Sequence, residues 1–170
     1  MKIQSTLILP LVAGAALLLA GCGKSEAPAA APAAAQAPAA DGVKAVSITA
    51  DDTMKFNVTE IRAVAGEKVR VTFKNVGRMP KQAMGHNWVL LVPMADNEVL
   101  ALAQGAAARA PEYLPADASK VLAHTKLLGP NESDTVEFTA PATPGEYPFV
   151  CTFPGHAALM KGKLIVAPKS

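Results

Sequence analysis

Apolar and polar residues alternate in three short segments, which is the pattern of a strand with one buried and one solvated face. The segments are Met54–Val58, Val69–Lys74 and Val136–Thr139. Less regular apolar runs bring the expected set to about eight strands. These runs are Val43–Thr49, Trp88–Val92, Val121–Thr125, Tyr147–Thr152 and Leu164–Ala167.

Turn-forming residues separate the predicted strands, at Ala65-Gly66, Gly77, Gly129-Pro130-Asn131 and Pro144-Gly145. One stretch, Ala95–Ala110, is instead rich in Ala and Leu, and it predicts a helix with Asp96 as its N-cap. Many short strands with a single helical insertion favour an antiparallel β-sandwich.

The N-terminus has a different pattern. Lys2 is followed by an uncharged run from Ile3 to Gly21, which is typical of a secretory signal. By length alone the run could span a membrane, so a retained helix with an incidental cysteine is one alternative. However, Leu19-Ala20-Gly21-Cys22 resembles the lipobox of bacterial lipoproteins, in which the cysteine is acylated and becomes the mature N-terminus. We therefore expect residues 1–21 to be a signal peptide and Cys22 to carry a lipid.

Residues 22–42 are mostly Ala and Pro after this cysteine. Such a segment has too few large apolar groups to offset chain entropy, and its prolines prevent a long helix. We expect a disordered tether, which leaves residues 43–170 as one domain of ordinary size.

Charge gives little sign of a nucleic-acid partner. The overall hydrophobic content of 51% is raised by the signal and the tether, so it does not indicate a membrane protein. Of the 16 Lys and Arg residues, Lys2 and Lys24 precede Asp41, and of the 14 Asp and Glu residues only Glu26 does. The domain therefore holds 14 basic and 13 acidic residues, a balance that does not favour binding to nucleic acid.

The second of the two cysteines, Cys151, is unpaired if Cys22 is lipidated. A free thiol in an oxidising compartment has to be buried or bound to a metal. Cys151 opens the segment CTFPGHAALM, which also holds His156 and Met160. The Pro154-Gly155 pair predicts a turn that directs Cys151 and His156 toward one point.

A further histidine, His86, precedes the most apolar predicted strand, in the segment MGHNWVLLV. Two imidazoles, a thiolate and a distant thioether form the donor set of blue-copper electron-transfer sites, because these donors suit both Cu(I) and Cu(II). Zinc could also occupy two histidines and a cysteine. A structural zinc site, however, would need a fourth strong ligand, which methionine does not provide.

Two segments, residues 85–90 and 151–162, resemble the copper-binding segments of azurins, which are bacterial cupredoxins, and the similarity extends over the whole domain. The resemblance implies a cupredoxin-like Greek-key β-sandwich that holds one copper ion, cycling between Cu(I) and Cu(II). In that family the matching residues are three ligands in a plane, a weak axial ligand, a carbonyl oxygen opposite it and an asparagine that ties the two ligand segments together. Here these positions are His86, Cys151, His156, Met160, Gly85 and Asn87.

The resemblance also implies an apolar surface for brief contact with redox partners, around the edge of the ligand that corresponds to His156. Partners of this kind include c-type cytochromes and copper-dependent reductases. A methionine-rich, weakly charged patch suits brief docking with several proteins. The matching positions are Met54, Met79, Met84, Phe153, Pro154 and Leu159. Trp88 corresponds to a tryptophan of the family's core, and His124 to a surface histidine.

The chain departs from most azurins in three ways. It has no cysteine for the family's disulfide, and Asn75 stands where a histidine near the copper is common, so we expect no pH switch there. The expected anchor and tether resemble those of lipid-modified azurins. Gly23 after the lipidated cysteine implies sorting to the outer membrane, with the domain facing either the periplasm or the exterior.

These features favour an electron carrier of the bacterial cell envelope rather than an enzyme, because no second metal, open coordination position or acid–base pair is apparent. Two other functions stay open. The protein could carry or store copper for its own sake, or it could be a redox-inert envelope protein that binds zinc.

Overall fold

A computed structural model describes residues 42–169 of the chain. The predicted signal peptide, Cys22 and nearly all of the predicted tether lie outside these residues. None of the helices within residues 42–169 is long and apolar enough to cross a membrane.

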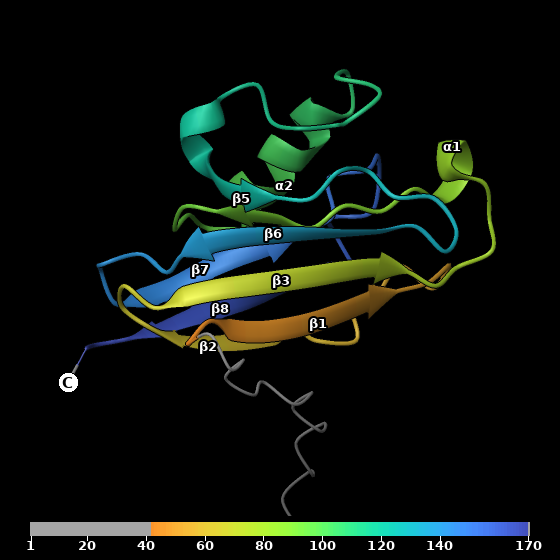
Figure 1. Ribbon diagram of the computed structural model, residues 1–170. Coiled ribbons are helices and arrows are strands. Elements are labelled where there is room, and N and C mark those ends of the chain that lie inside the picture. The colour runs from red at the N-terminus through yellow and green to blue at the C-terminus, as the bar shows by residue number, and fades with distance from the viewer. Residues whose placement is uncertain (1–41, 170) are drawn as a thin grey trace, which may run out of the picture. The chain divides into compact units, whose positions relative to one another are not determined.

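Two β-sheets face each other in a sandwich (Figure 1). The smaller sheet has the strand order β1 (Lys44–Ala50), β3 (Lys68–Asn75), β6 (Ser133–Thr139). The larger sheet has the order β2 (Glu60–Val64), β8 (Lys161–Ala167), β7 (Gly145–Val150), β4 (Val89–Leu91), β5 (Val121–His124). The prediction of a β-sandwich with about eight strands is confirmed.

The sheets are mixed rather than purely antiparallel, so that detail of the prediction was wrong. β1 runs parallel to β3, with Val46 opposite Val71, and β2 runs parallel to β8, with Ile61 opposite Leu164. The remaining strand pairs are antiparallel. Consecutive strands β1, β2 and β3 alternate between the two sheets, and strands that are not joined by a tight hairpin are free to pair in parallel.

One predicted strand is absent and an unpredicted one replaces it. Residues 54–58 form an irregular segment in which only Phe56 makes a single bridge, to Ala50, and Met54 has a φ of 57°. The strand in this region is β2, where the buried Ile61 and Ala63 alternate with residues that are partly or fully exposed. Phe56 and Val58 are buried nonetheless, because alternation reports which side chains face the core and not which backbone groups pair.

The helical insertion is α2 (Asp96–Ala106), which ends four residues earlier than predicted. Its N-cap is Ala95 rather than Asp96, and the Glu98 carboxylate accepts the Ala95 N–H at 2.8 Å. Asp96 instead pairs with Lys161 on β8, with 2.8 Å between Oδ2 and Nζ. Two short helices, α1 (Lys81–Met84) and η1 (Ala118–Lys120), were not predicted.

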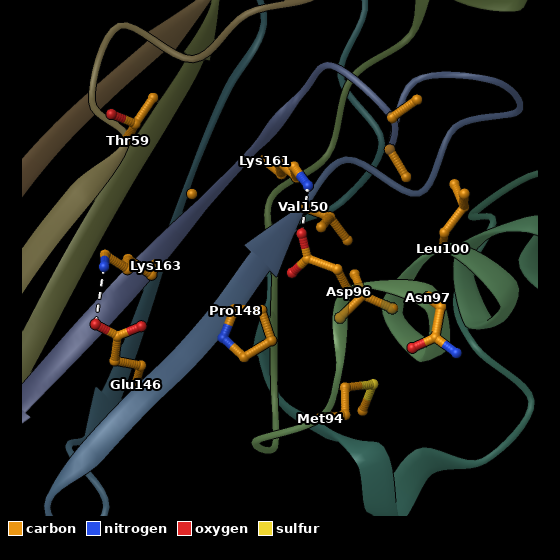
Figure 2. A pocket seen from close by; sticks show the side chains of 14 residues that line it. Thr59, Met94, Asp96, Asn97, Leu100, Glu146, Pro148, Val150, Lys161 and Lys163 are labelled. Carbon is orange, nitrogen blue, oxygen red and sulfur yellow. Dashed lines mark hydrogen bonds and ion pairs between the residues drawn. The ribbon is translucent and has the colours of Figure 1, made fainter.

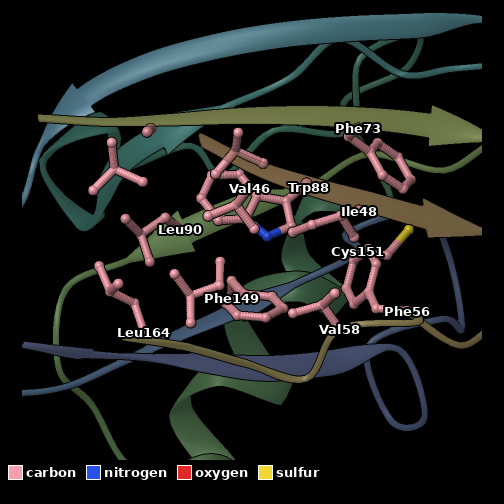
Figure 3. Close-up of a cluster of buried hydrophobic side chains, with 14 of the residues drawn as sticks. Val46, Ile48, Phe56, Val58, Phe73, Trp88, Leu90, Phe149, Cys151 and Leu164 are labelled. Carbon is pink, nitrogen blue, oxygen red and sulfur yellow. The ribbon is translucent and has the colours of Figure 1, made fainter. Parts of the chain in front are cut away.

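Two clusters of buried side chains hold these layers together. The main cluster lies between the sheets around Trp88, whose ring centroid is 5.5 Å from that of Phe149 and 6.0 Å from that of Phe138. Figure 3 shows Cys151 at one end of this cluster. The second cluster joins α2 to the larger sheet, with Val99 and Ala103 against strand residues such as Leu91. The thiol therefore lies where the packed core ends and loops begin.

Candidate metal centre

Strand pairing brings the two candidate ligand segments together. β4 pairs antiparallel with β7, with Val89 opposite Val150, so the start of β4 lies beside the end of β7. His86 lies just before β4 and Cys151 directly follows β7. The two residues are 65 positions apart in the chain, yet their side chains meet at the same end of the larger sheet.

Three donor atoms converge there. The Nδ1 atoms of His86 and His156 are 3.2 Å apart, and the Cys151 Sγ lies 4.0 Å from the first and 3.6 Å from the second. All three side chains are buried, and these are the residues of the described part whose donor atoms group closely enough to hold a metal ion.

The loop after Cys151 folds back on itself as the sequence predicts. Gly155 has a φ of 82°, a left-handed conformation that glycine adopts without steric cost. The His156 N–H donates to the Phe153 carbonyl at 3.0 Å, and the Met160 N–H donates to the His156 carbonyl at 2.8 Å. The loop closes where the Cys151 N–H donates to the Met160 carbonyl at 3.0 Å, and Met160 is fully buried.

The ring of His86 is oriented by a carbonyl on a distant loop. Its Nε2 lies 3.0 Å from the Asp51 carbonyl oxygen, which can only accept a hydrogen bond. In the neutral ring Nε2 therefore carries the proton, and Nδ1 presents its lone pair to the other donors. The carbonyl of Asp51 thus fixes the tautomer that a metal requires.

Gly85 is enclosed on the other side of His86. A Cβ atom added there would lie 2.7 Å from the Lys81 carbonyl oxygen and 3.0 Å from the Leu127 side chain. His86 itself exchanges two backbone hydrogen bonds with Leu128, at 3.0 and 2.7 Å. The backbone on this side is therefore packed too closely for any side chain at position 85.

Asn87 joins the two ligand segments. Its Oδ1 accepts the Thr152 N–H at 2.8 Å, and its Nδ2 donates to the Thr152 Oγ1 at 2.9 Å. Both residues are fully buried and each is adjacent to a candidate ligand, Asn87 to His86 and Thr152 to Cys151. This pair of bonds fixes the distance between the two segments.

The site is uncharged in the metal-free protein. Burial raises the pKa of the Cys151 thiol to about 12, although backbone N–H groups of Asn87 and Phe153 that donate to the sulfur act in the opposite direction. Burial lowers the pKa of His156 to about 4, helped by repulsion from His86. Burial also lowers the pKa of His86. At neutral pH the cluster is one thiol and two neutral imidazoles.

These donors fit a single copper ion. Donor atoms bound to one such ion at about 2 Å lie roughly 3 to 4 Å from one another, which is the spacing seen here. A thiolate and two imidazoles suit both oxidation states of copper. Met160, which is buried in the same loop, and the Gly85 carbonyl are the further groups that would hold the ion.

The residues of the expected docking patch differ in exposure. Leu159 is 59% exposed and Met79 is 42% exposed, and Pro154 is exposed as well. Met54 and Met84 are half-buried, whereas Phe153 is buried with 8% of its surface exposed.

Three other positions considered from the sequence are not among the converging donors. Trp88 is in the core, and His124 is exposed on β5. Asn75 is buried, where its Nδ2 donates to the Leu128 carbonyl at 3.1 Å and its Oδ1 accepts the Gly77 N–H at 2.8 Å.

Sequence reasoning missed residues that act through their backbone carbonyls. Besides Asp51, these are Glu112, whose carbonyl accepts from Asn87 Nδ2 at 3.2 Å, and Tyr113, whose carbonyl accepts from Thr152 Oγ1 at 2.6 Å. Every residue has a carbonyl, so no residue type signals this role.

A pocket of about 610 Å³ lies between α2 and strands β7 and β8 (Figure 2). Its lining is mostly apolar and includes two ion pairs, Asp96 with Lys161 and Glu146 with Lys163. Ala157, which follows His156, is one of its walls. None of the three converging donors lines this pocket.

Comparison with known proteins identifies the family. Residues 43–167 match the family described as copper binding proteins, plastocyanin/azurin family. The chain is 43% identical over 121 residues to azurin of Achromobacter denitrificans, covering 69% of this chain and 80% of that protein. It is 38% identical over 122 residues to outer membrane protein H.8 of Neisseria meningitidis serogroup B, covering 71% of this chain and 66% of that protein.

Among solved structures, auracyanin A is similar. This "blue" copper protein comes from the green thermophilic photosynthetic bacterium Chloroflexus aurantiacus. It is 36% identical in sequence, with a TM-score of 0.66, and the match covers 74% of this chain and 100% of that one.

Proposed function

The chain belongs to the plastocyanin/azurin family of copper-binding proteins, and from this premise we propose that it is a type 1 (blue) copper protein that carries single electrons. Copper is its cofactor. We propose that His86, Cys151 and His156 would hold the ion, together with Met160 and the Gly85 carbonyl. Copper bound there would supply a one-electron couple between Cu(I) and Cu(II).

The observation that carries the proposal is the buried triangle of donors formed by His86, Cys151 and His156. Its members are held by contacts outside the triangle, from the Asp51 carbonyl to His86 and from the Asn87 side chain to the segment of Cys151. Donors that are fixed in this way move little when charge changes at the centre. Small movement is what rapid single-electron exchange requires.

Partner proteins would dock beside His156. Pro154 and Leu159 flank this residue in the loop and are exposed, and Met79 adds a third exposed apolar side chain. Together with Met54, Met84 and Phe153 they form the proposed docking patch. We propose c-type cytochromes or copper-dependent reductases as the kind of partner that uses it. A carrier without substrate chemistry of its own, rather than an enzyme, fits a metal centre that is closed by packed side chains.

We also propose that the domain, residues 43–170, is tethered to the outer membrane. The lipobox-like sequence that ends at Cys22 supports lipid attachment after removal of residues 1–21. The similarity to an outer membrane protein of Neisseria supports the location. Residues 22–42 would then separate the domain from the membrane surface. Fatty-acid labelling that is lost in Cys22→Ala tests the anchor.

The absorption spectrum of the copper-loaded protein tests the electron-transfer function. We expect an intense visible band from the bond between copper and the Cys151 sulfur, and we expect Cys151→Ser to abolish it. A copper-loaded wild type without such a band would contradict the proposal. His124→Ala, which changes an exposed histidine outside the site, is the matched control and should keep the band.

If the band is present, the alternative of copper carriage or storage is tested by kinetics. An electron carrier exchanges electrons with a c-type cytochrome quickly and gives up copper to a chelator slowly. The reverse order of rates would favour the carrier or storage function.

A further inference from the structure

The segment that follows α2, residues 107–117, extends back to the metal centre. Its Glu112 carbonyl accepts from Asn87 Nδ2 at 3.2 Å, and its Tyr113 carbonyl accepts from Thr152 Oγ1 at 2.6 Å. Asn87 and Thr152 already bond to each other. Two consecutive carbonyls of the segment after α2 therefore complete the hydrogen bonding of Asn87 and Thr152, the pair that joins the two ligand segments.

A third segment is attached to the same dipeptide. The Glu112 carboxylate accepts the Leu127 N–H at 3.3 Å. Leu127 packs against Gly85, and its neighbour Leu128 bonds to the backbone of His86. Glu112 thus bonds to the segments on both sides of His86. Its carbonyl bonds to Asn87, and its carboxylate bonds to Leu127.

The side chain of Tyr113 provides a contact through rings. Its ring meets that of Phe153 edge to face, with centroids 5.2 Å apart and planes at 71°. The Phe153 ring in turn lies 4.7 Å from the His156 ring, centroid to centroid. The edge-to-face arrangement of Tyr113 and Phe153 is favourable for an aromatic pair. It leaves Phe153 little freedom to move away from the His156 imidazole.

The backbone at Tyr113 is in a conformation that its residue type does not favour. Its φ is 52°, in the left-handed region, which for a bulky residue is a genuine outlier and is sterically unfavourable. The Tyr113 N–H donates to the Arg109 carbonyl at 2.9 Å, which helps to hold the turn. An aromatic residue at a left-handed position indicates that the ring is needed there, because Asn or Gly would suit the backbone better.

From these contacts we propose that Glu112 and Tyr113 are positioning residues of the metal centre. Tyr113 keeps Phe153 packed on the His156 ring, and the two carbonyls keep Asn87 and Thr152 in place. The segment after α2, residues 107–117, then has a role at the metal centre. This inference rests on the proposed function, since it assigns a role at the same centre.

Two substitutions at one position separate the ring from the backbone. Tyr113→Phe keeps the ring, whereas Tyr113→Asn removes it and places at φ 52° a residue that tolerates this conformation. The control is Phe138→Ala, which removes an aromatic contact with Trp88 in the core. Phe138 lies on β6, so this control removes a core ring without changing a residue of either ligand segment.

The test compares the affinity for copper, the visible spectrum and the reduction potential of each variant. It also compares the NMR signals of the Phe153 and His156 rings in the metal-free protein. Tyr113→Asn should weaken copper binding by roughly tenfold, a typical effect of changing an outer contact of a metal site. It should also shift the absorption band and the potential and broaden the His156 ring signals. Tyr113→Phe and Phe138→Ala should leave the copper affinity within about twofold of wild type. They should leave the absorption band, the potential and the ring signals unchanged.

The outcomes distinguish the two proposals. If wild type has no blue-copper band, the proposed function fails. If wild type has the band but Tyr113→Asn has wild-type affinity, potential and ring signals, the positioning role alone is overturned. Equal effects in Tyr113→Asn and Phe138→Ala would likewise overturn it, because general loss of stability would then account for both.

Discussion

The Nδ1 atoms of His86 and His156 lie 3.2 Å apart although 70 residues separate them in the chain. The pairing of β4 with β7 causes this approach, because it places the segment before β4 beside the loop after β7. Two imidazole nitrogens at this distance in a buried site cannot both be protonated without strong repulsion. In the metal-free protein the two imidazoles therefore resist protonation. The stability of the folded protein has to depend on pH as a result.

The first prediction concerns that dependence. The pKa of His156 is lowered to about 4 in the folded protein, and that of His86 is lowered as well, from an ordinary value of 6.5. Between pH 6.5 and about 4 the unfolded chain binds more protons than the folded one, so stability is greatest above pH 6.5 and falls as the pH decreases toward 4. The slope cannot exceed about 1.4 kcal/mol per pH unit for each histidine, because each histidine takes up at most one proton on unfolding.

Urea unfolding of the metal-free protein at pH 7.0 and pH 5.0 measures this slope. His156→Asn should reduce it, whereas His124→Ala, which changes an exposed histidine, should reproduce the wild-type slope. A metal-free wild type that is equally stable at both pH values would contradict the assignment of buried, neutral imidazoles.

The second prediction concerns protons released on copper uptake. The Cys151 thiol has a pKa of about 12, so it is protonated in the metal-free protein at pH 7 and has to lose its proton to become a ligand. Addition of Cu(II) at pH 7.5 in weak buffer should release about one proton per copper bound. A pH indicator measures the release, and Cys151→Ser should release little. Uptake without proton release would mean that the thiol is not a ligand.

The third prediction concerns Asn87. Asn87→Ala would leave the buried Thr152 N–H without its acceptor and would remove two further bonds, to Thr152 Oγ1 and to the Glu112 carbonyl. We expect a loss of about 2–4 kcal/mol in the free energy of unfolding of the metal-free protein. Chemical denaturation measures this loss.

Asn57→Ala is the matched control for Asn87. Asn57 Oδ1 also accepts a backbone N–H, that of Thr49, but this bond is exposed to solvent. Water can replace the lost partner there, so the cost should be about 1 kcal/mol or less. Equal losses in the two variants would argue against a special role for the bonds of Asn87.

The fourth prediction concerns Gly85. In Gly85→Ala the new Cβ would lie 2.7 Å from the Lys81 carbonyl oxygen, a backbone atom that cannot move without shifting the segment of His86. We expect lower stability, by about 1–3 kcal/mol, and a changed copper spectrum, because the neighbouring ligand is displaced. Gly105→Ala is the control, since Gly105 lies within α2 and a Cβ there meets no atom within 4 Å. It should raise stability by about 0.5–1 kcal/mol.

Much of the sandwich could be predicted because the alternation of apolar and polar residues in a strand shows which of its side chains are buried. Val69, Val71 and Phe73 of β3 are buried and alternate with polar residues, and this alternation is visible in the sequence. The pattern does not record hydrogen bonding, so residues 54–58 were mistaken for a strand and β2 was missed. Nor does it record strand direction, which is why the two parallel pairs were not foreseen.

The candidate ligands could be named from the sequence because their chemistry is rare and partly local. A cysteine, a histidine and a methionine within ten residues, around a Pro-Gly turn, restrict the possible metals whatever the rest of the fold does. Asp51, Glu112 and Tyr113 could not be found in this way, because they act through backbone carbonyls or through contacts between distant loops.

The sequence by itself thus determined the donor types, the turn that joins Cys151 to His156 and the alternation that makes a two-layered β fold. The tertiary structure alone decided which carbonyl orients His86, how closely Gly85 is packed and that the insertion after α2 reaches the metal centre. The physical reason is that local composition dictates burial and turn geometry over a few residues. Contacts between backbone groups far apart in the chain exist only after the sheets have formed.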